Sequence, residues 1–224
     1  MTNNPLKLGT LGQSVWLDYI RRDLMSSGGL QRLIGEDGLR GMTSNPSIFE
    51  KAIVESHDYD EDIQALALQG KDAEAIYEAI SQRDVEGARR PVGVVRQVGI
   101  DLQTDISIFA VSPVVERPEL STGAKDPDYS DVKYVEALIG PDTVNTTPVK
   151  TPNAYRDHGE PKARLEQDVN QARWVLERLP ELGIGIDHVT RQLEDEGVEK
   201  FNQPFDKLIA ALAQRSPRQL AREV

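Results

Sequence analysis

Two groups of polar residues follow apolar, β-rich runs near the N-terminus. The first is Asp18, inside the run SVWLDYI, and the second is the motif TSNPS, which contains Thr43, Ser44 and Asn45. A carboxylate can take up and release protons in a reaction. The carboxyl ends of parallel strands are where (β/α) proteins hold such side chains. Two plainer interpretations stay open: Asp18 as a surface residue at a strand end, and Asn45 before Pro46 as ordinary turn chemistry.

Metal and thiol chemistry find little support in the sequence. The chain has no cysteine, which excludes disulfides, thiolate nucleophiles and cysteine-ligated zinc. His57, His158 and His188 are scattered, without a second ligand at metal spacing. The acidic run at residues 58–62 lacks the glycine and the final glutamate of an EF-hand loop, so a solvated helix start is the better interpretation. We therefore expect no metal site.

The bulk properties restrict the partners. The chain has 224 residues and a formal net charge of -11, and its basic groupings are short, so a nucleic-acid partner is not expected. No apolar run approaches the roughly 18 residues that a membrane-spanning helix needs. The N-terminus has no secretory signal pattern. These features predict a cytoplasmic protein without a membrane or nucleic-acid partner.

Strand patterns alternate with helix patterns along the chain. The strand patterns lie at residues 14–20, 38–48, 92–100, 105–112 and 142–148, with a weak strand before the loop at 120–127. The helix patterns lie at residues 24–34, 49–70, 72–83, 129–139, 162–179 and 187–196, and continue beyond Pro204, a break or kink. Val189 and Leu193 are expected to point inward. The alternation predicts an α/β fold with parallel strands. Roughly five strands are about three short of a closed eight-stranded barrel, which takes about 250 residues.

Long stretches of the chain resemble the transaldolases of the longer bacterial type. The first are SVWLDYIRRDL and GMTSNPSIFEKAI, which look like the first two strands of that family. The run from STGAKDP to TVNTTP, with the helical sequences that follow it, looks like the last two strands and the closing helices. The resemblance covers roughly residues 1–86 and 119–215. It implies a shortened TIM-barrel-like parallel sheet with a helical C-terminal region, in a single domain 1–224 that is incomplete between about 87 and 119.

The resemblance also implies a chemistry. Transaldolases of the pentose phosphate pathway move a dihydroxyacetone unit between sugar phosphates through a Schiff base with lysine, without a metal or organic cofactor. Asp18 matches the proton-transferring aspartate of the first strand, and Asn45 matches the asparagine that positions the covalent intermediate, with Thr43 and Ser44 beside it.

The phosphate-binding loop of the family follows its seventh strand. Ser121 and Lys125 match this loop, although a solvated loop lysine is the common alternative for Lys125. A sugar phosphate is therefore the expected partner.

Two departures from the family pattern divide the functional hypotheses. Ala110 stands where the glutamate of the third strand belongs, and no lysine lies inside an apolar strand pattern. One hypothesis is a transaldolase-family enzyme. The second is a non-catalytic, shortened or engineered barrel that binds sugar phosphate weakly or associates with itself through an exposed sheet edge. The third is a helical interaction module at residues 162–215.

Overall fold

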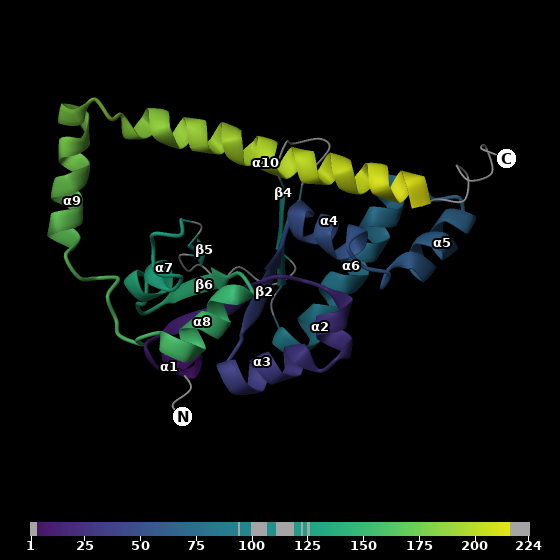
Figure 1. The fold of residues 1–224 in the computed structure, drawn as a ribbon, viewed down its shortest axis with the longest axis horizontal. Helices are drawn as coiled ribbons and strands as arrows, with labels where there is room; N and C mark the ends of the chain where they lie inside the picture. The colour runs from purple at the N-terminus through teal and green to yellow at the C-terminus, as the bar shows by residue number, and fades with distance from the viewer. Residues whose placement is uncertain are drawn as a thin grey trace.

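The computed structural model describes residues 4–93, 95–99, 107–110, 119–121, 123–124 and 126–215, and of the three short stretches from 95 to 121 only the backbone is described. The described strands form one six-stranded sheet in the order β4-β3-β2-β1-β6-β5 (Figure 1). Their bounds are β1 Gln13–Asp18, β2 Gly41–Ser44, β3 Val95–Gly99, β4 Ser107–Ala110, β5 Glu119–Ser121 and β6 Thr143–Thr147.

The sheet is parallel except at one end. The pairs β5–β6, β6–β1, β1–β2 and β2–β3 are parallel, which confirms the α/β class. Strand β4 runs antiparallel to β3, so the expectation of an entirely parallel sheet was wrong at this strand. The connection through residues 100–106 is shorter than the dozen or more residues that a parallel crossover needs.

Helices surround the sheet. Their bounds are α1 Asn4–Thr10, α2 Arg22–Ser26, α3 Gly29–Asp37, α4 Pro46–Val54, α5 Asp60–Leu68, α6 Ala73–Val92, α7 Lys133–Ala137, α8 Lys150–His158, α9 Val169–Arg178 and α10 Ile186–Arg215, with a 3-10 turn η1 at Leu179–Leu182. Helices α1 and α8 were not predicted, because neither carries a long apolar stripe. Helix α10 continues through Pro204, which corrects the expected break.

The core lies in two clusters on the helix-covered face of the sheet. The larger cluster joins β1 and β2 to α3, α4, α5, α6 and the C-terminal part of α10, with Leu17, Met42, Phe49, Ile76 and Leu208 fully buried. The smaller cluster joins β1 to α1, α7 and α8. Both clusters are built on β1, which therefore holds the site residue Asp18 from a well-packed strand.

An ion cluster, in which Asp84 is buried and Arg83 is exposed, connects α2, α5 and α6. Arg22 Nε donates to Asp84 Oδ1 at 2.9 Å, and Tyr59 Oη donates to Asp84 Oδ2 at 2.8 Å. Asp62 lies 2.6 Å from both Arg22 Nη1 and Arg83 Nη1. Burial raises the pKa of the Asp84 carboxyl, against the attraction of Arg22. The bonds from Arg83 and Arg22 lower the pKa of Asp62, against partial burial.

The C-terminal end of α10 is fixed to α4 and α5 by one arginine. Arg215 Nη1 donates to the carbonyl oxygen of Ile53 at 2.8 Å and lies 3.2 Å from Asp60 Oδ1, while Nη2 donates to the carbonyl of Val54 at 3.1 Å. These carbonyls belong to the last turn of α4, where no helical N–H remains to bond them. Arg215 therefore caps α4 while it holds α10 in place.

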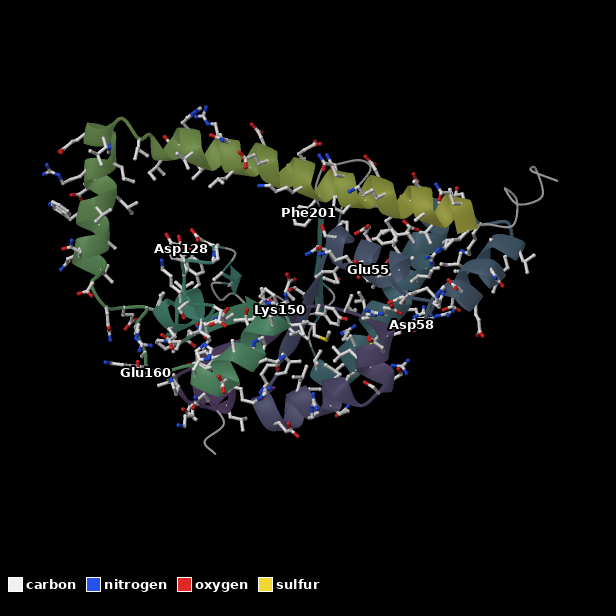
Figure 2. The ribbon with its side chains drawn as sticks, viewed as in Figure 1. Glu55, Asp58, Asp128, Lys150, Glu160 and Phe201 are labelled. Atoms are coloured by element: carbon white, nitrogen blue, oxygen red, sulfur yellow. The ribbon has the colours of Figure 1, made fainter. Side chains whose placement is uncertain are left out.

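The other end of α10 and the whole of α9 extend away from the sheet (Figure 1). Every residue of α9 is exposed, and so is every residue at 186–195. Val189 is 37% exposed and Leu193 is 59% exposed, so the expectation that they point inward was wrong. Their helical spacing predicted a packing face, but the described part of this chain does not supply its partner. Figure 2 places Phe201 where α10 reaches the rest of the molecule.

Candidate active site

Strand β1 ends at the site, and its inner residues are fixed by close packing. Trp16 is 2% exposed, and its Nε1 donates to Ser14 Oγ at 3.1 Å. Gly41 of β2 lies opposite Trp16 in the parallel register. A Cβ at Gly41 would lie 2.3 Å from the indole ring, so glycine is required there by the close approach of the two strands.

Asp18, Thr43 and Thr146 form a hydrogen-bonded group at the carboxyl ends of three neighbouring strands. Thr43 Oγ1 donates to Asp18 Oδ1 at 2.6 Å, and it lies 2.8 Å from Thr146 Oγ1. Thr43 and Thr146 are buried. Because β2, β1 and β6 are parallel neighbours, the three side chains meet at one edge of the sheet, where (β/α) active sites lie.

The contact between Thr43 and Thr146 also shows that the sheet curves. Their strands, β2 and β6, lie on either side of β1. Strands two apart in a flat sheet are separated by about 9.5 Å, too far for two threonine side chains to meet. The 2.8 Å approach of their hydroxyls therefore requires curvature toward this face, as in the wall of a barrel.

Burial gives the Asp18 carboxyl an altered acidity. Loss of solvent raises its pKa, and the hydrogen bond from Thr43 acts in the opposite direction. A carboxyl balanced in this way can accept hydrogen bonds from substrate hydroxyls when ionised and can carry a proton when neutral. The proton-transferring role that the resemblance implies for Asp18 stays a prediction.

The side chains of the TSNPS motif occupy different positions and make different contacts. Thr43 shares the face of Asp18, so the alternation of a strand places Ser44 on the opposite face, toward the helices. The Ser44 hydroxyl is buried, and no hydrogen-bond partner for it lies among the described residues. Asn45 caps α4, since its Oδ1 accepts from the N–H of Ile48 at 3.1 Å. The structure thus brings Thr43 to Asp18, and it gives Ser44 and the Asn45 oxygen other positions.

Two expected phosphate ligands are placed only in part. Ser121 ends β5, and the parallel register sets it beside Thr146 of β6, at the same edge of the sheet as Asp18. Lys125 lies outside the described residues.

Ala110, which stands where the family has a glutamate, ends β4. It pairs with Arg96 of β3, which in turn pairs with Thr43 of β2, and β4 runs antiparallel to β3.

The lysines decide which chemistry the site can support. Eight lysines lie in the described part of the chain, and all eight are exposed: Lys7, Lys51, Lys71, Lys133, Lys150, Lys162, Lys200 and Lys207. Figure 2 shows Lys150 on α8, and Lys133 Nζ lies over the Tyr129 ring at 3.2 Å. A lysine nucleophile needs a desolvated pocket to lower its pKa, and none of these eight occupies one.

Metal and membrane features can be judged over the same residues. Within the described ranges, no three histidine or acidic side chains come together in a way that could hold a metal ion. No described helix combines the length and apolar character that crossing a bilayer requires.

Comparison with known sequences agrees with the geometry. The sequence model of the "Transaldolase/Fructose-6-phosphate aldolase" family matches residues 15–108 and 107–212. The chain belongs to this family. The two matched stretches contain Asp18, the TSNPS motif and β6, and the second begins where the first ends.

The transaldolases among its relatives are longer than this chain. A transaldolase of Thiobacillus denitrificans is 27% identical over 349 aligned positions, covering 90% of this chain and 97% of the relative. One from Trichodesmium erythraeum is 24% identical over 372 positions. Both alignments exceed the 224 residues of the chain, so these relatives contain segments without a counterpart here.

One higher local similarity is confined to one part of the chain. A transaldolase of Neisseria gonorrhoeae is 42% identical over 92 residues, which make up 41% of this chain and 26% of the relative.

Sequence reasoning missed Thr146. The motif TVNTTP was interpreted as a strand of the family, but none of its side chains was assigned a role. Thr146 lies opposite Trp16 in the register, and alternation within β1 puts Trp16 and Asp18 on one face, so Thr146 shares the face of Asp18. The register of β6 against β1 was the missing information, because pairing between strands distant in sequence is not visible from either strand alone.

Proposed function

We propose that this transaldolase-family protein binds phosphorylated sugars at Asp18, Thr43 and Thr146, and that its dihydroxyacetone transfer is severely impaired. The observation that carries the proposal is the combination of an ordered Asp18–Thr43 pair at 2.6 Å with eight exposed lysines. The ligand-holding part of the site is retained, while a desolvated amine is missing from the described residues.

The binding part of the proposal follows from the donors and acceptors. An ionised Asp18 accepts hydrogen bonds from the vicinal hydroxyls of a sugar, and Thr43 and Thr146 offer further hydroxyls beside it. The resemblance gives Ser121 and Lys125 to the phosphate, and Ser121 lies at the same sheet edge. A phosphate at that edge would leave the sugar chain pointing toward Asp18.

The chemical part follows from what transfer requires. An uncharged amine attacks the ketone, and the resulting iminium withdraws electrons as the carbon–carbon bond breaks. An exposed lysine is almost wholly protonated near pH 7 and cannot attack. Ala110 offers no oxygen to accept a proton, and its strand runs against the direction of β3. Loss of a nucleophile typically removes most of a rate enhancement, by several orders of magnitude.

We place the missing segment of the barrel between about residues 87 and 119, within a single domain 1–224. The restart of the family match at residue 107 and the antiparallel β4 support this position. The lack of cysteine fits a reducing compartment, and we place the protein in the cytoplasm.

Calorimetric titration with fructose 6-phosphate tests binding. We expect measurable binding that weakens about tenfold in Asp18→Asn, the loss of one charge-assisted hydrogen bond. Asp206→Asn is the matched control, because Asp206 is exposed on α10, outside the sheet. Equal affinities for both variants would show that Asp18 does not hold the sugar.

Borohydride trapping tests the chemistry. The protein is incubated with fructose 6-phosphate, reduced, and weighed intact by mass spectrometry. We expect the unmodified mass in a sample shown to be folded by circular dichroism. An adduct mapped to a single lysine, with Lys125 as the first candidate, would overturn the proposed impairment and establish a transaldolase-type enzyme.

A further inference from the structure

His158 bonds two carboxylates at the C-terminal end of α8. Its Nε2 lies 2.8 Å from Asp131 Oδ1, and its Nδ1 lies 3.2 Å from Asp157 Oδ2. A neutral imidazole carries one N–H, and an ionised carboxylate can only accept, so the two bonds together require the imidazolium form. The bond to Asp131 and then the bond to Asp157 raise the pKa of His158 above its ordinary value of 6.5. The C-terminal end of a helix also favours a cation.

Other charged groups lie on the elements around this end of α8, and several of them are already paired. They are Lys7 in α1, Lys133 and Glu136 in α7, Arg156 in α8, and Glu160, Lys162 and Arg164 after α8. Arg156 bonds Asp37 of α3, and Arg164 forms an ion pair with Glu160. Strand β6, on which α8 packs, contributes no charged side chain. Among the described side chains, Asp131 and Asp157 therefore bond the ring, and loss of the proton breaks at least one of these bonds.

Helix α8 meets the chain that follows β5 at both of its ends. At its C-terminal end, His158 bonds Asp131, which lies two residues before α7. At its N-terminal end, Pro148 packs so closely on Gly123 that a Cβ there would lie 2.9 Å from the proline ring. Ser121 ends β5 two residues before Gly123. The nine residues of α8 extend about 14 Å, so this helix fixes two points of the connection between β5 and α7.

The chain between these two contacts has its own internal bonds. Asp126 Oδ1 accepts from the N–H of Asp128 at 3.0 Å, and the Asp126 carbonyl accepts from the N–H of Tyr129 at 3.2 Å. Lys133 Nζ lies 3.2 Å from the centroid of the Tyr129 ring. Because packed and hydrogen-bonded segments move together, a displacement of Asp131 is carried back toward the end of β5.

We propose that protonated His158 is a clamp that holds the connection after β5 in the arrangement that binds the phosphate end of a sugar phosphate. The clamp rests on the proposed function, which gives Ser121 to the phosphate. After deprotonation, one ring nitrogen presents a lone pair to a carboxylate, and that contact is released. Because the pKa of His158 is raised, the clamp is closed below the ordinary value and opens as the pH rises through the raised pKa. Affinity for the phosphate end should therefore fall on the alkaline side.

Proton NMR of the imidazole rings in the full-length chain tests the clamp. We expect His158 to titrate at a lower pH in Asp131→Asn than in the wild type. The displacement should be smaller in Asp157→Asn, because the bond to Asp131 is the shorter one. Spectra of His158→Gln assign the resonance, and the resonance of His188 on α10 should not move in either aspartate variant. The same titration of His158 in the wild type and in Asp131→Asn would overturn the proposal.

Calorimetric titration with fructose 6-phosphate tests the effect on binding, with His158→Gln and the wild type compared at the same pH. We expect binding to be about two- to fivefold weaker in the variant near pH 6, the range for an exposed ion pair, and equal near pH 9. His188→Gln is the matched control and should bind like the wild type at both pH values, since His188 is exposed on α10. Equal affinities of His158→Gln and the wild type near pH 6 would overturn the proposal.

Amide hydrogen exchange separates the clamp from the proposed function. If the wild type does not bind fructose 6-phosphate, the proposed function fails, and exchange at residues 126–133 decides whether the clamp exists. Faster exchange in His158→Gln than in the wild type near pH 6 would support the clamp, and equal exchange would overturn it. Circular dichroism shows whether the variant is folded, and the side chain of His158 is 48% exposed, so its replacement leaves the core untouched.

Discussion

The carboxylate of Asp18 and the hydroxyl of Thr43 lie 2.6 Å apart, and this hydrogen bond opposes the effect of burial on the same carboxyl. Burial raises the pKa of Asp18, and the bond from Thr43 lowers it. The two residues come from different strands, so the acidity of Asp18 depends on the pairing of β1 with β2.

Thr43→Val should raise the pKa of Asp18 further, because it removes the donor and keeps the volume. If sugar binding needs the ionised carboxylate, binding is lost as the pH falls through this pKa, and the midpoint should move upward in the variant. Calorimetric titrations with fructose 6-phosphate at several values between about pH 4 and pH 8 measure the midpoint. Thr43→Ser keeps the hydroxyl and should keep the wild-type midpoint. An unchanged midpoint in Thr43→Val would show that the bond does not control Asp18.

Asp62→Asn should destabilise the protein more at neutral pH than at a pH below the ordinary pKa of Asp62. The folded pKa of Asp62 is lowered below the ordinary value of 3.8, so its contribution is present above that value and is lost as the pH falls through the folded pKa. The ion pairs of Asp62 with Arg22 and Arg83 are partly open to solvent, which limits the loss in the free energy of unfolding to about 0.5–1 kcal/mol at pH 7. Urea unfolding at pH 7 and near pH 3 measures the difference. Asp84, whose pKa is raised, has the opposite dependence. A loss of equal size at both pH values would contradict an electrostatic origin.

Gly41→Ala should destabilise the fold through Trp16. The new methyl group would lie 2.3 Å from the indole ring, and the forced shift should cost about 1–3 kcal/mol. Thermal unfolding followed by tryptophan fluorescence measures the loss. Gly35→Ala is the control: no atom lies within 4 Å of its Cβ position, and in helix α3 the change should stabilise by about 0.5–1 kcal/mol. Equal stabilities for the two variants would show that β1 and β2 can separate without loss.

Arg215→Ala should loosen the C-terminal turns of α10. The variant loses the bonds to the carbonyls of Ile53 and Val54 and to Asp60, so amide hydrogen exchange should accelerate at the end of α4 and in α10 near Leu212. The overall loss in the free energy of unfolding should be about 0.5–1.5 kcal/mol, as for a partly exposed hydrogen bond whose acceptors water can reach. Lys207→Ala, an exposed change on the same helix, should leave exchange unaltered. Protection that stays the same in Arg215→Ala would mean that apolar packing alone fixes the helix.

The sequence predicted the parts of the fold that local patterns encode. The alternation in SVWLDYI is local, and β1 begins and ends close to where it was expected. The helix pattern expected at 49–70 is two helices, α4 and α5, and α4 begins within the strand expected at 38–48. The direction of β4 and the meeting of Thr43 with Thr146 depend on pairing between distant segments. Val189 shows a second limit. An apolar stripe predicts that a helix face is packed, but it does not say what packs against that face.

Helix α10 is long and is held at one end only. Its 30 residues extend about 45 Å, and only the C-terminal part is held by the core and by Arg215. Pro204 has no N–H to donate to the carbonyl of Lys200, so one backbone hydrogen bond of the helix is missing between the part held by the core and the exposed part. The section from Ile186 to Pro204 is roughly 27 Å long, so a rotation of about 10° there would carry α9 through about 5 Å. Small adjustments in a few residues around Pro204 therefore set the reach of α9.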